Sequence, residues 1–390
     1  MTAHPSVLED ASWNVTAVGH TDLNGHGDCM HVNVQGNYAY VAHMGGDRVG
    51  TSVVDVSDPA RPRVVTQVET PAGTHSHKVQ VVDDIMVVNH ERNPAEPNAT
   101  EWSAGLKFFD ISDPSRPKEI GFFPTPGKGT HRMTYLEPPY IYLSGSDHGY
   151  SDQFLIIVDA GDPSRPVEVG RWWLPGMRIG AGEVPGWPRR RRYAHHHANV
   201  RGDRAYATWW DAGLVILDIA DPSAPRLVSH LRFDPTQSGA THSALPLPGR
   251  DILVVTDEAV NHGREGIFPK QVRVVDISDE TKPVVVSTFP IPDGNFADQG
   301  GRFGPHNVHE MRPGSYRSAN RVHLTYFNAG LRILDVTDPR APIETGFYIP
   351  RPAQGAKEIQ LNDLTVTEDG LIFVTDRAGG GLYILRDELA

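Results

Sequence analysis

The sequence has very little cysteine and no long apolar run. Cys29 is the only cysteine among 390 residues, which excludes internal disulfides and cysteine-based zinc clusters. No stretch approaches the roughly 20 apolar residues that are needed to span a bilayer. The N-terminal residues lack the basic flank and apolar segment of a signal peptide. These absences predict a soluble, cytoplasmic protein that does not bind membranes.

Basic residues are scarce relative to acidic ones. Lys and Arg number 36 against 48 Asp and Glu, which gives a formal net charge of −12. A surface of this sign disfavours extensive binding to nucleic acid or to anionic lipid. Hydrophobic residues make up 39% and charged residues 22%, as expected for a globular protein with a substantial core. The expected partner is a small molecule, and the sequence leaves open whether the chain forms an oligomer.

One segment type, an apolar strand that ends in Asp and is followed by a turn, recurs along the chain, with Asp-Pro in five of its six copies; "KFFDISDPSRP" is an example. Its six copies lie at 52–62, 107–117, 156–166, 215–225, 273–283 and 332–342. Asp and Ser side chains favour such a turn because they cap its backbone, and Pro presets the dihedral angle. A spacing of about 50–60 residues is typical of propeller blades or solenoid units.

Each unit also has two strands before the turn and one after it, so the pattern predicts four strands per unit and almost no helix. Four-stranded sheets repeated radially form a β-propeller. An open β-solenoid or a pair of sandwiches is the alternative. The favoured fold class is all-β, a seven-bladed β-propeller with four-stranded blades.

The seventh unit is incomplete. Residues 362–385 supply three strands, and residues 12–20 resemble a fourth strand that has no unit before it. Pairing between the two ends would close the ring and remove exposed sheet edges. We therefore expect a single domain over 1–390, with residues 12–20 completing the blade formed by 356–386.

The repeated segments resemble those of the LVIVD-repeat family, named after its strand before the turn. The resemblance covers nearly the whole chain and implies the propeller, but not a particular activity. The seventh copy departs from the family pattern because Arg386 stands where the repeated Asp should be.

Alignment of the units on their first strand reveals a histidine column. The residue just before each strand is, in order, Met30, His77, His131, His196, His242, His306 and Asn362. The residue two places later is always apolar, which supports the alignment independently. The first residues of the inner strands meet at one mouth of a propeller. Duplication of a structural histidine would give the same column, but His75, His195 and His197 crowd the same region.

We therefore predict that His77, His131, His196, His242 and His306 bind one divalent transition metal, with three or four of them as ligands. Imidazole ligands suit Mn, Zn or Fe, and Cu as a further choice.

Other residues near the same mouth are candidates for catalysis and substrate binding. The candidate catalytic residues are Glu310, Glu258 and His197. The candidate substrate-binding residues are Arg189, Arg190, Arg302 and Asn362. Arginines clamp carboxylates through paired hydrogen bonds, and carboxylates near a metal act as acids, as bases or as orienting groups.

In architecture and ligand type the arrangement resembles carotenoid-cleaving oxygenases, oligogalacturonate lyases and selenium-binding-type thiol oxidases, which are histidine-rich propellers with iron, manganese and copper respectively. The favoured function is a metal-dependent enzyme that acts on a small anionic organic substrate by elimination, hydration or hydrolysis. The alternatives are a mononuclear iron or copper oxygenase or oxidase, and a non-catalytic interaction scaffold.

Overall fold

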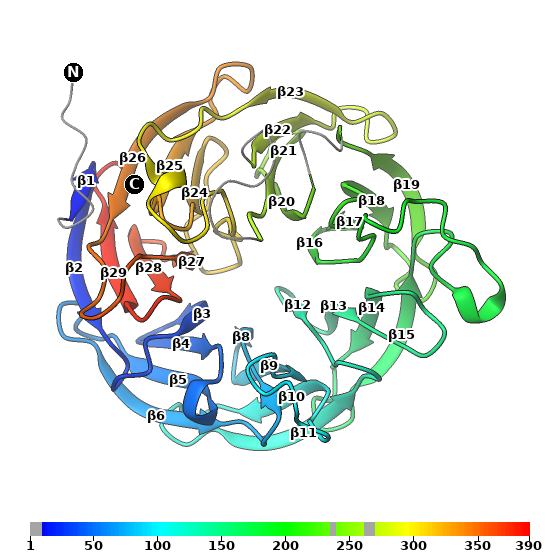
Figure 1. Cartoon of the computed structure of the whole chain (residues 1–390), viewed down its shortest axis with the longest axis horizontal. Coiled ribbons are helices and arrows are strands. Elements are labelled where there is room, and N and C mark those ends of the chain that lie inside the picture. The colour runs from blue at the N-terminus through cyan, green and yellow to red at the C-terminus, as the bar shows by residue number, and fades with distance from the viewer. Residues whose placement is uncertain (1–9, 235–238, 261–269) are drawn as a thin grey trace.

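The computed structural model describes residues 10–234, 239–260 and 270–390, and folds them into seven sheets around a central axis (Figure 1). The first blade contains β3 (Cys29–Gln35), β4 (Tyr38–His43), β5 (Val49–Asp55) and β6 (Arg63–Glu69). The second contains β7 (Thr74–His75), β8 (Val79–Val82), β9 (Ile85–Arg92), β10 (Gly105–Asp110) and β11 (Lys118–Pro124). The third contains β12 (Arg132–Thr134), β13 (Tyr140–Gly145), β14 (Phe154–Asp159) and β15 (Val167–Trp172).

The remaining four blades follow the same plan. The fourth contains β16 (His197–Arg201), β17 (Arg204–Thr208), β18 (Leu214–Asp218) and β19 (Arg226–Leu231). The fifth contains β20 (Thr241–Pro246), β21 (Ile252–Asp257), β22 (Val272–Asp276) and β23 (Val284–Thr288). The sixth contains β24 (Arg321–Thr325), β25 (Leu331–Asp335), β26 (Ile343–Ile349) and β1 (Ala11–Trp13). The seventh contains β27 (Leu361–Val366), β28 (Leu371–Asp376), β29 (Gly381–Asp387) and β2 (Val15–Thr21).

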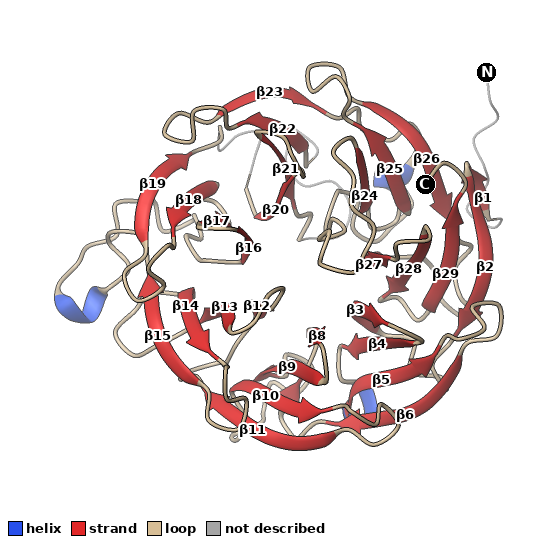
Figure 2. Ribbon diagram, turned by 180° about the vertical axis from the view of Figure 1, so that it is seen from behind, coloured by secondary structure: helices blue, strands red, loops and turns tan. Residues whose placement is uncertain are grey.

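Helix is confined to three short 3-10 turns in the described part of the chain (Figure 2). They are η1 (Gly46–Arg48), η2 (Ile179–Ala181) and η3 (Phe296–Asp298). None of the helices found there is long and apolar enough to cross a membrane.

The N-terminal strands close the ring, as the sequence predicts. β2 pairs antiparallel with β29, with Val15 opposite Asp387 and Thr21 opposite Leu382, and so forms the outer strand of the seventh blade. β1, which contains Ser12 and Trp13 of the predicted closing strand, instead pairs with β26 and extends the preceding blade. The two ends of the chain thus share the last two sheets, and the seven-bladed propeller is confirmed.

The repeated Asp-Pro turns are held by the side-chain caps that their sequence predicts. Asp55 accepts a hydrogen bond from the backbone N–H of Ser57 at 3.0 Å, and Asp276 accepts one from Ser278 at 2.8 Å. The equivalent aspartates of the other four turns make the same contact. Because the cap involves only neighbours in the chain, every copy of the repeat forms the same turn.

The hydrophobic core lies between the blades. One cluster joins Phe108 of the second blade, Met133 and Ile157 of the third, and Trp209 of the fourth, and all four are almost fully buried. The apolar residue two places after each histidine-column position is buried as well. Apolar packing between neighbouring blades leaves the inner strand ends around the axis for polar side chains.

The inner segment of the sixth blade differs from the prediction. The sequence predicts a strand directly after His306, whereas the structure has only an isolated bridge between Val308 and Leu324 there. The chain leaves the strand path at Met311, whose φ is 50°. The segment after His306 crosses the axis of the ring instead of continuing along the blade.

Candidate metal centre

Five imidazole rings form a continuous arc around the central axis, one from each of the second to sixth blades. They belong to His77, His131, His196, His242 and His306. The distances between successive ring centroids are 4.9, 5.4, 4.0 and 4.2 Å. Met30 and Asn362 hold the same position in the other two blades, and the Asn362 amide donates to the Met30 carbonyl. Because the five histidines hold equivalent positions in their blades, the fold brings together rings that are up to 229 residues apart in the sequence.

Two carboxylates divide this arc into two groups. The Glu258 group consists of His196, His242, His306 and Glu258. Nε2 of His242 lies 3.8 Å from one oxygen of Glu258, and Nε2 of His306 lies 3.7 Å from the other. Ligand atoms of His196, His242 and Glu258 all lie within 4.8 Å of one another, which is close enough to share one metal ion.

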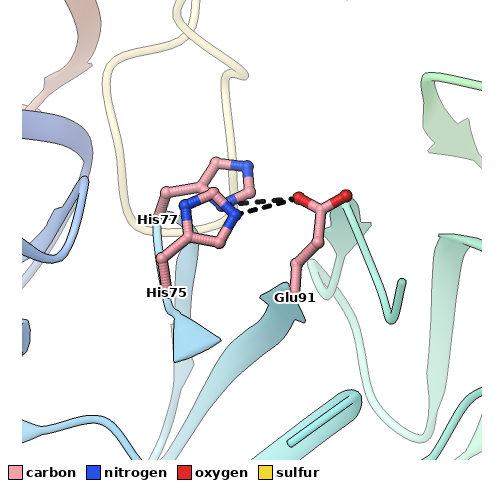
Figure 3. Close-up of side chains that lie close together, drawn as sticks. All are labelled: His75, His77 and Glu91. Atoms are coloured by element: carbon pink, nitrogen blue, oxygen red, sulfur yellow. Dashed lines mark hydrogen bonds and ion pairs between the residues drawn. The ribbon is translucent and has the colours of Figure 1, made fainter. Parts of the chain in front are cut away.

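The Glu91 group consists of His75, His77, His131 and Glu91. Glu91, near the end of β9, lies 3.2 Å from Nε2 of His75 and 3.0 Å from Nδ1 of His131. Figure 3 shows the stacked rings of His75 and His77 facing this carboxylate. Burial raises the pKa of Glu91, but the His131 and His75 side chains outweigh it and lower that pKa to about 2. The sequence predicts one shared site for five histidines, whereas the structure has two groups, each with its own carboxylate.

Hydrogen bonds to the backbone orient the rings of the Glu258 group. Nδ1 of His196 lies 3.0 Å from the carbonyl oxygen of His242, and Nδ1 of His306 lies 2.6 Å from that of Asn362. A carbonyl oxygen only accepts, so Nδ1 of His196 must carry the proton. Nδ1 of His306 also lies 3.1 Å from the amide nitrogen of Asn307, but its contact with the carbonyl is the shorter one and requires the proton on Nδ1 as well. In a neutral ring, Nε2 then keeps its lone pair, as a metal ligand requires.

The Glu91 group is oriented differently. The Asn89 amide nitrogen lies 3.1 Å from Nδ1 of His77, and its oxygen already accepts from the backbone N–H of Lys78 at 2.7 Å. Nδ1 of His77 is therefore an acceptor, and the proton of its neutral ring lies on Nε2. Nε2 is buried without a hydrogen-bond partner among the described residues. A metal bound to His77 would have to displace the Asn89 contact or change the tautomer, which the Glu258 group does not require.

Burial keeps four rings of the arc neutral at physiological pH. Desolvation lowers the pKa of His77, His196, His242 and His306 well below the ordinary value, and nearby positive charges lower it further. Neutral imidazole is the form that binds metal. The His131 side chain is 30% exposed, so solvent reaches the arc on this side.

A second polar layer lies one residue further along the inner strands. Its members are His31, Lys78, Arg132, His197, Ser243, Asn307 and Asp363. Several of these side chains bond across blades; Arg132, for example, donates to Asn307 at 2.8 Å and to Glu310 at 3.1 Å. Asp363 accepts from the backbone N–H of Val32 at 2.9 Å. The layer satisfies backbone groups at the inner edges of the blades, which have no further strand to pair with.

Residues 309–312, here called the plug, cross the axis beneath this layer. Arg312 donates to the side chains of Asn33 and Gln80 and to the carbonyl of Tyr135, and so reaches the first three blades from the sixth. Glu310 contacts Arg132, and Nε2 of His197 lies 3.2 Å from it. This crossing explains why no regular strand continues from His306.

The other predicted site residues lie at different distances from the arc. Glu310 and His197 are paired inside the protein at the plug, whereas Glu258 lies beside the arc. Arg302 donates to Glu258 at 2.8 Å, and its guanidinium lies over the ring of Phe327. Asn362 belongs to the circle of column positions, where its amide donates to the Met30 carbonyl.

The arginines at 189–192 differ in their exposure and contacts. Arg189 and Arg190 are exposed. Arg192 instead lies over the ring of Trp210, with its guanidinium carbon 4.4 Å from the centroid, and Trp210 contacts His196 edge-on. Arg192 also forms an ion pair with Asp152 at 2.9 Å.

Sequence reasoning missed Lys78 and Arg132 as members of the site. A signal was present, because the residue after every column position is polar. The importance of these two cations follows from their burial around the axis, which no local pattern reveals.

Comparisons with known proteins agree with this architecture. The LVIVD repeat model matches residues 26–70, 100–125, 149–173, 197–232 and 322–349. No curated protein sequence is similar enough to count as a match.

Solved structures resemble the whole ring at low sequence identity. U3-55K is 8% identical with a TM-score of 0.62, over 95% of this chain and 98% of that one. A hypothetical selenium-binding protein from Sulfolobus tokodaii is 13% identical with a TM-score of 0.54, over 90% and 92%. The computationally designed Ika8 protein is 9% identical with a TM-score of 0.55, over 95% and 99%. At these identities the likeness concerns the fold alone. Its repeats and its seven blades place the chain in the LVIVD-repeat family of β-propellers.

Proposed function

We propose that this protein is a metal-dependent enzyme that acts on a small anionic organic substrate by elimination, hydration or hydrolysis. The carrying observation is the orientation of His196 and His306. Each ring donates Nδ1–H to a carbonyl, which leaves Nε2 free to bind a metal ion beside Glu258. Structural histidines satisfied by the fold alone would not need a shared carboxylate on their other side.

The Glu258 group is the proposed primary site. His196, His242 and His306 supply imidazole nitrogens, and Glu258 is a fourth ligand or a base next to the ion. Imidazoles with a carboxylate suit Mn, Fe or Zn, with Cu as a further choice. The Glu91 group is a secondary site, because its His77 nitrogen is already engaged by Asn89.

The chemistry would combine the ion with the neighbouring charges. A bound divalent metal lowers the pKa of a water molecule and stabilises negative charge that develops on a substrate. Glu258 is placed to take a proton there, and Arg302 holds this carboxylate by a 2.8 Å contact. Glu310 and His197, also predicted as catalytic, are paired at the plug, so we assign the base to Glu258.

Metal analysis of untagged protein, alongside a His242→Ala variant, tests the proposal. Wild type should carry stoichiometric transition metal and turn over small carboxylate or phosphate substrates only when metal is present. The His242→Ala variant should lose both properties but still fold, since the core lies between the blades. His148→Ala is the matched control because His148 is exposed.

Three outcomes would count against this function. Full metal content in the His242→Ala variant would contradict the assigned ligands. Metal-dependent oxygen uptake would favour the oxygenase or oxidase alternative. Wild type that binds no metal under any loading condition would favour a non-catalytic scaffold.

A further inference from the structure

Lys78 is a buried cation without a visible counterion. It follows His77 directly in the second layer, and the residue is only 3% exposed. Within the described residues, no hydrogen bond or ion pair joins its ammonium group to another side chain. Transferring an ammonium group from water into a protein is costly unless the charge is paired. A buried charge that the protein leaves unpaired is typical of a binding site in which the ligand carries the opposite charge.

Lys78 lies close to the axis. It belongs to the second layer, where Arg132 of the third blade reaches Asn307 of the sixth at 2.8 Å and Glu310 of the plug at 3.1 Å. Contacts between blades on opposite sides of the ring place this layer around the axis. Lys78, in the second blade, is therefore buried next to the arc.

The surrounding charges do not neutralise Lys78. Arg132 and Arg312 share Glu310, at 3.1 and 3.7 Å respectively. Asp363 is engaged by the backbone N–H of Val32, and Nε2 of His31 lies 3.5 Å from it. The second layer and the plug thus hold one more cation than carboxylates. Burial and the neighbouring charge of Arg132 lower the pKa of Lys78, and the charges of Asp363 and Glu258 oppose this only in part.

We infer that Lys78 binds the oxyanion of the substrate, with the anion lying between the histidine arc and the plug. This inference rests on the proposed function and refines it, because it names the group that holds the charge of the substrate. The recognised chemistry is a carboxylate or a phosphate-type oxyanion of a small molecule. Access is from the solvent-reached side of the arc, because the plug fills the axis on the other side.

The site also explains the choice of anion over cation. An oxyanion placed against Lys78 would lie next to the arc, and a metal ion held by the Glu258 group would add positive charge beside it. A cationic ligand would meet Lys78 and the neighbouring Arg132 and be repelled. Arg189 and Arg190, which are exposed, would have no role in this contact.

Anion titration of Lys78 variants tests the inference. Acetate and inorganic phosphate serve as probes, with chloride at matched ionic strength, and thermal unfolding at increasing concentrations gives the affinity. Lys78→Met should weaken the affinity for at least one probe by about tenfold or more, as expected for loss of one charge-assisted hydrogen bond. The probe that stabilises wild type more strongly tells a carboxylate site from a phosphate site. Lys118→Met, at an exposed lysine, is the matched control and should bind like wild type.

A second measurement separates anion binding from a structural role. Without added anion, Lys78→Met should unfold at a temperature no lower than wild type, because the ammonium group it removes has no partner. An affinity within twofold of wild type would overturn the inference. Unfolding of both Lys78→Met and Lys78→Gln would also overturn it, since Lys78 would then stabilise the fold itself.

Metal content measured on the same samples separates this inference from the proposed function. Loss of anion affinity in Lys78→Met with the metal retained supports the inference. Wild type that lacks metal yet loses anion binding on substitution of Lys78 would refute the proposed metal enzyme and leave the anion site standing. Metal-loaded wild type that binds neither probe would refute the anion site alone.

Discussion

Acid should destabilise the metal-free protein well above the pH at which carboxylates titrate. The fold buries histidines in their neutral form, and His195 and His309 are clear cases. Burial, followed by the neighbouring charge of His197, lowers the pKa of His195 to about 3. Burial, followed by His323, lowers the pKa of His309 to about 3. Unfolded chains take up these protons near pH 6.5, whereas the folded protein does not.

The sign and size of the effect follow from this difference. Because the folded pKa lies below the unfolded one, the stabilisation is complete above about pH 6.5 and is lost as the pH falls. At pH 5, each such histidine lowers the free energy of unfolding by about 2 kcal/mol. Two histidines therefore remove about 4 kcal/mol, a large part of the 5–15 kcal/mol typical of folded proteins.

Urea unfolding of chelator-treated protein between pH 8 and pH 5 measures this loss. A His195→Leu variant keeps an apolar side chain against Trp209, whose ring centroid lies 5.1 Å from that of His195. The variant should lose stability less steeply below pH 6, by about 1.4 kcal/mol per pH unit. His148→Leu, at an exposed site, should keep the wild-type slope. If His195→Leu also keeps the wild-type slope, the neutral burial of His195 is wrong.

Two further predictions concern closure of the ring. Deletion of residues 1–21 removes β1 and β2, so the seventh blade loses its outer strand and the buried Val15; the melting temperature should fall sharply, and an unchanged value would contradict the closure. Asp387→Ala should cost about 3–5 kcal/mol in urea unfolding, because it leaves two partners without their acceptor. Arg321 contacts this carboxylate at 2.6 and 2.7 Å and His323 at 2.8 Å, so a loss below about 1 kcal/mol would mean that water replaces the contacts.

The fold could be predicted from the sequence because it is built from local, repeated signals. Each Asp-Pro turn depends on a side chain that caps its own backbone two residues later, as Asp55 caps Ser57. Copies of such a turn at a regular spacing determine the number of blades. The unmatched strand near the N-terminus, now β2, indicates how the ring closes.

The histidine arc could also be predicted from the sequence. Ring symmetry places equivalent positions at the same height, so an ungapped column was enough to bring His77 through His306 together. Symmetry does not determine how the rings rotate or which carboxylates approach them. Glu91 lies near the end of β9 and Glu258 directly follows β21, and these two carboxylates divide the arc into two groups.

The centre of the ring was decided only by the tertiary structure. From the sequence, residues 309–312 are predicted to continue a strand. In the structure Arg312 instead donates hydrogen bonds to acceptors in three other blades, so the segment crosses the axis. In the sequence, Lys78 is one polar residue next to a histidine. Its burial without a contacting carboxylate results only from closure of the ring. Contacts across the axis join residues far apart in the chain, and their free energies depend on burial and distance, which a local sequence pattern does not contain.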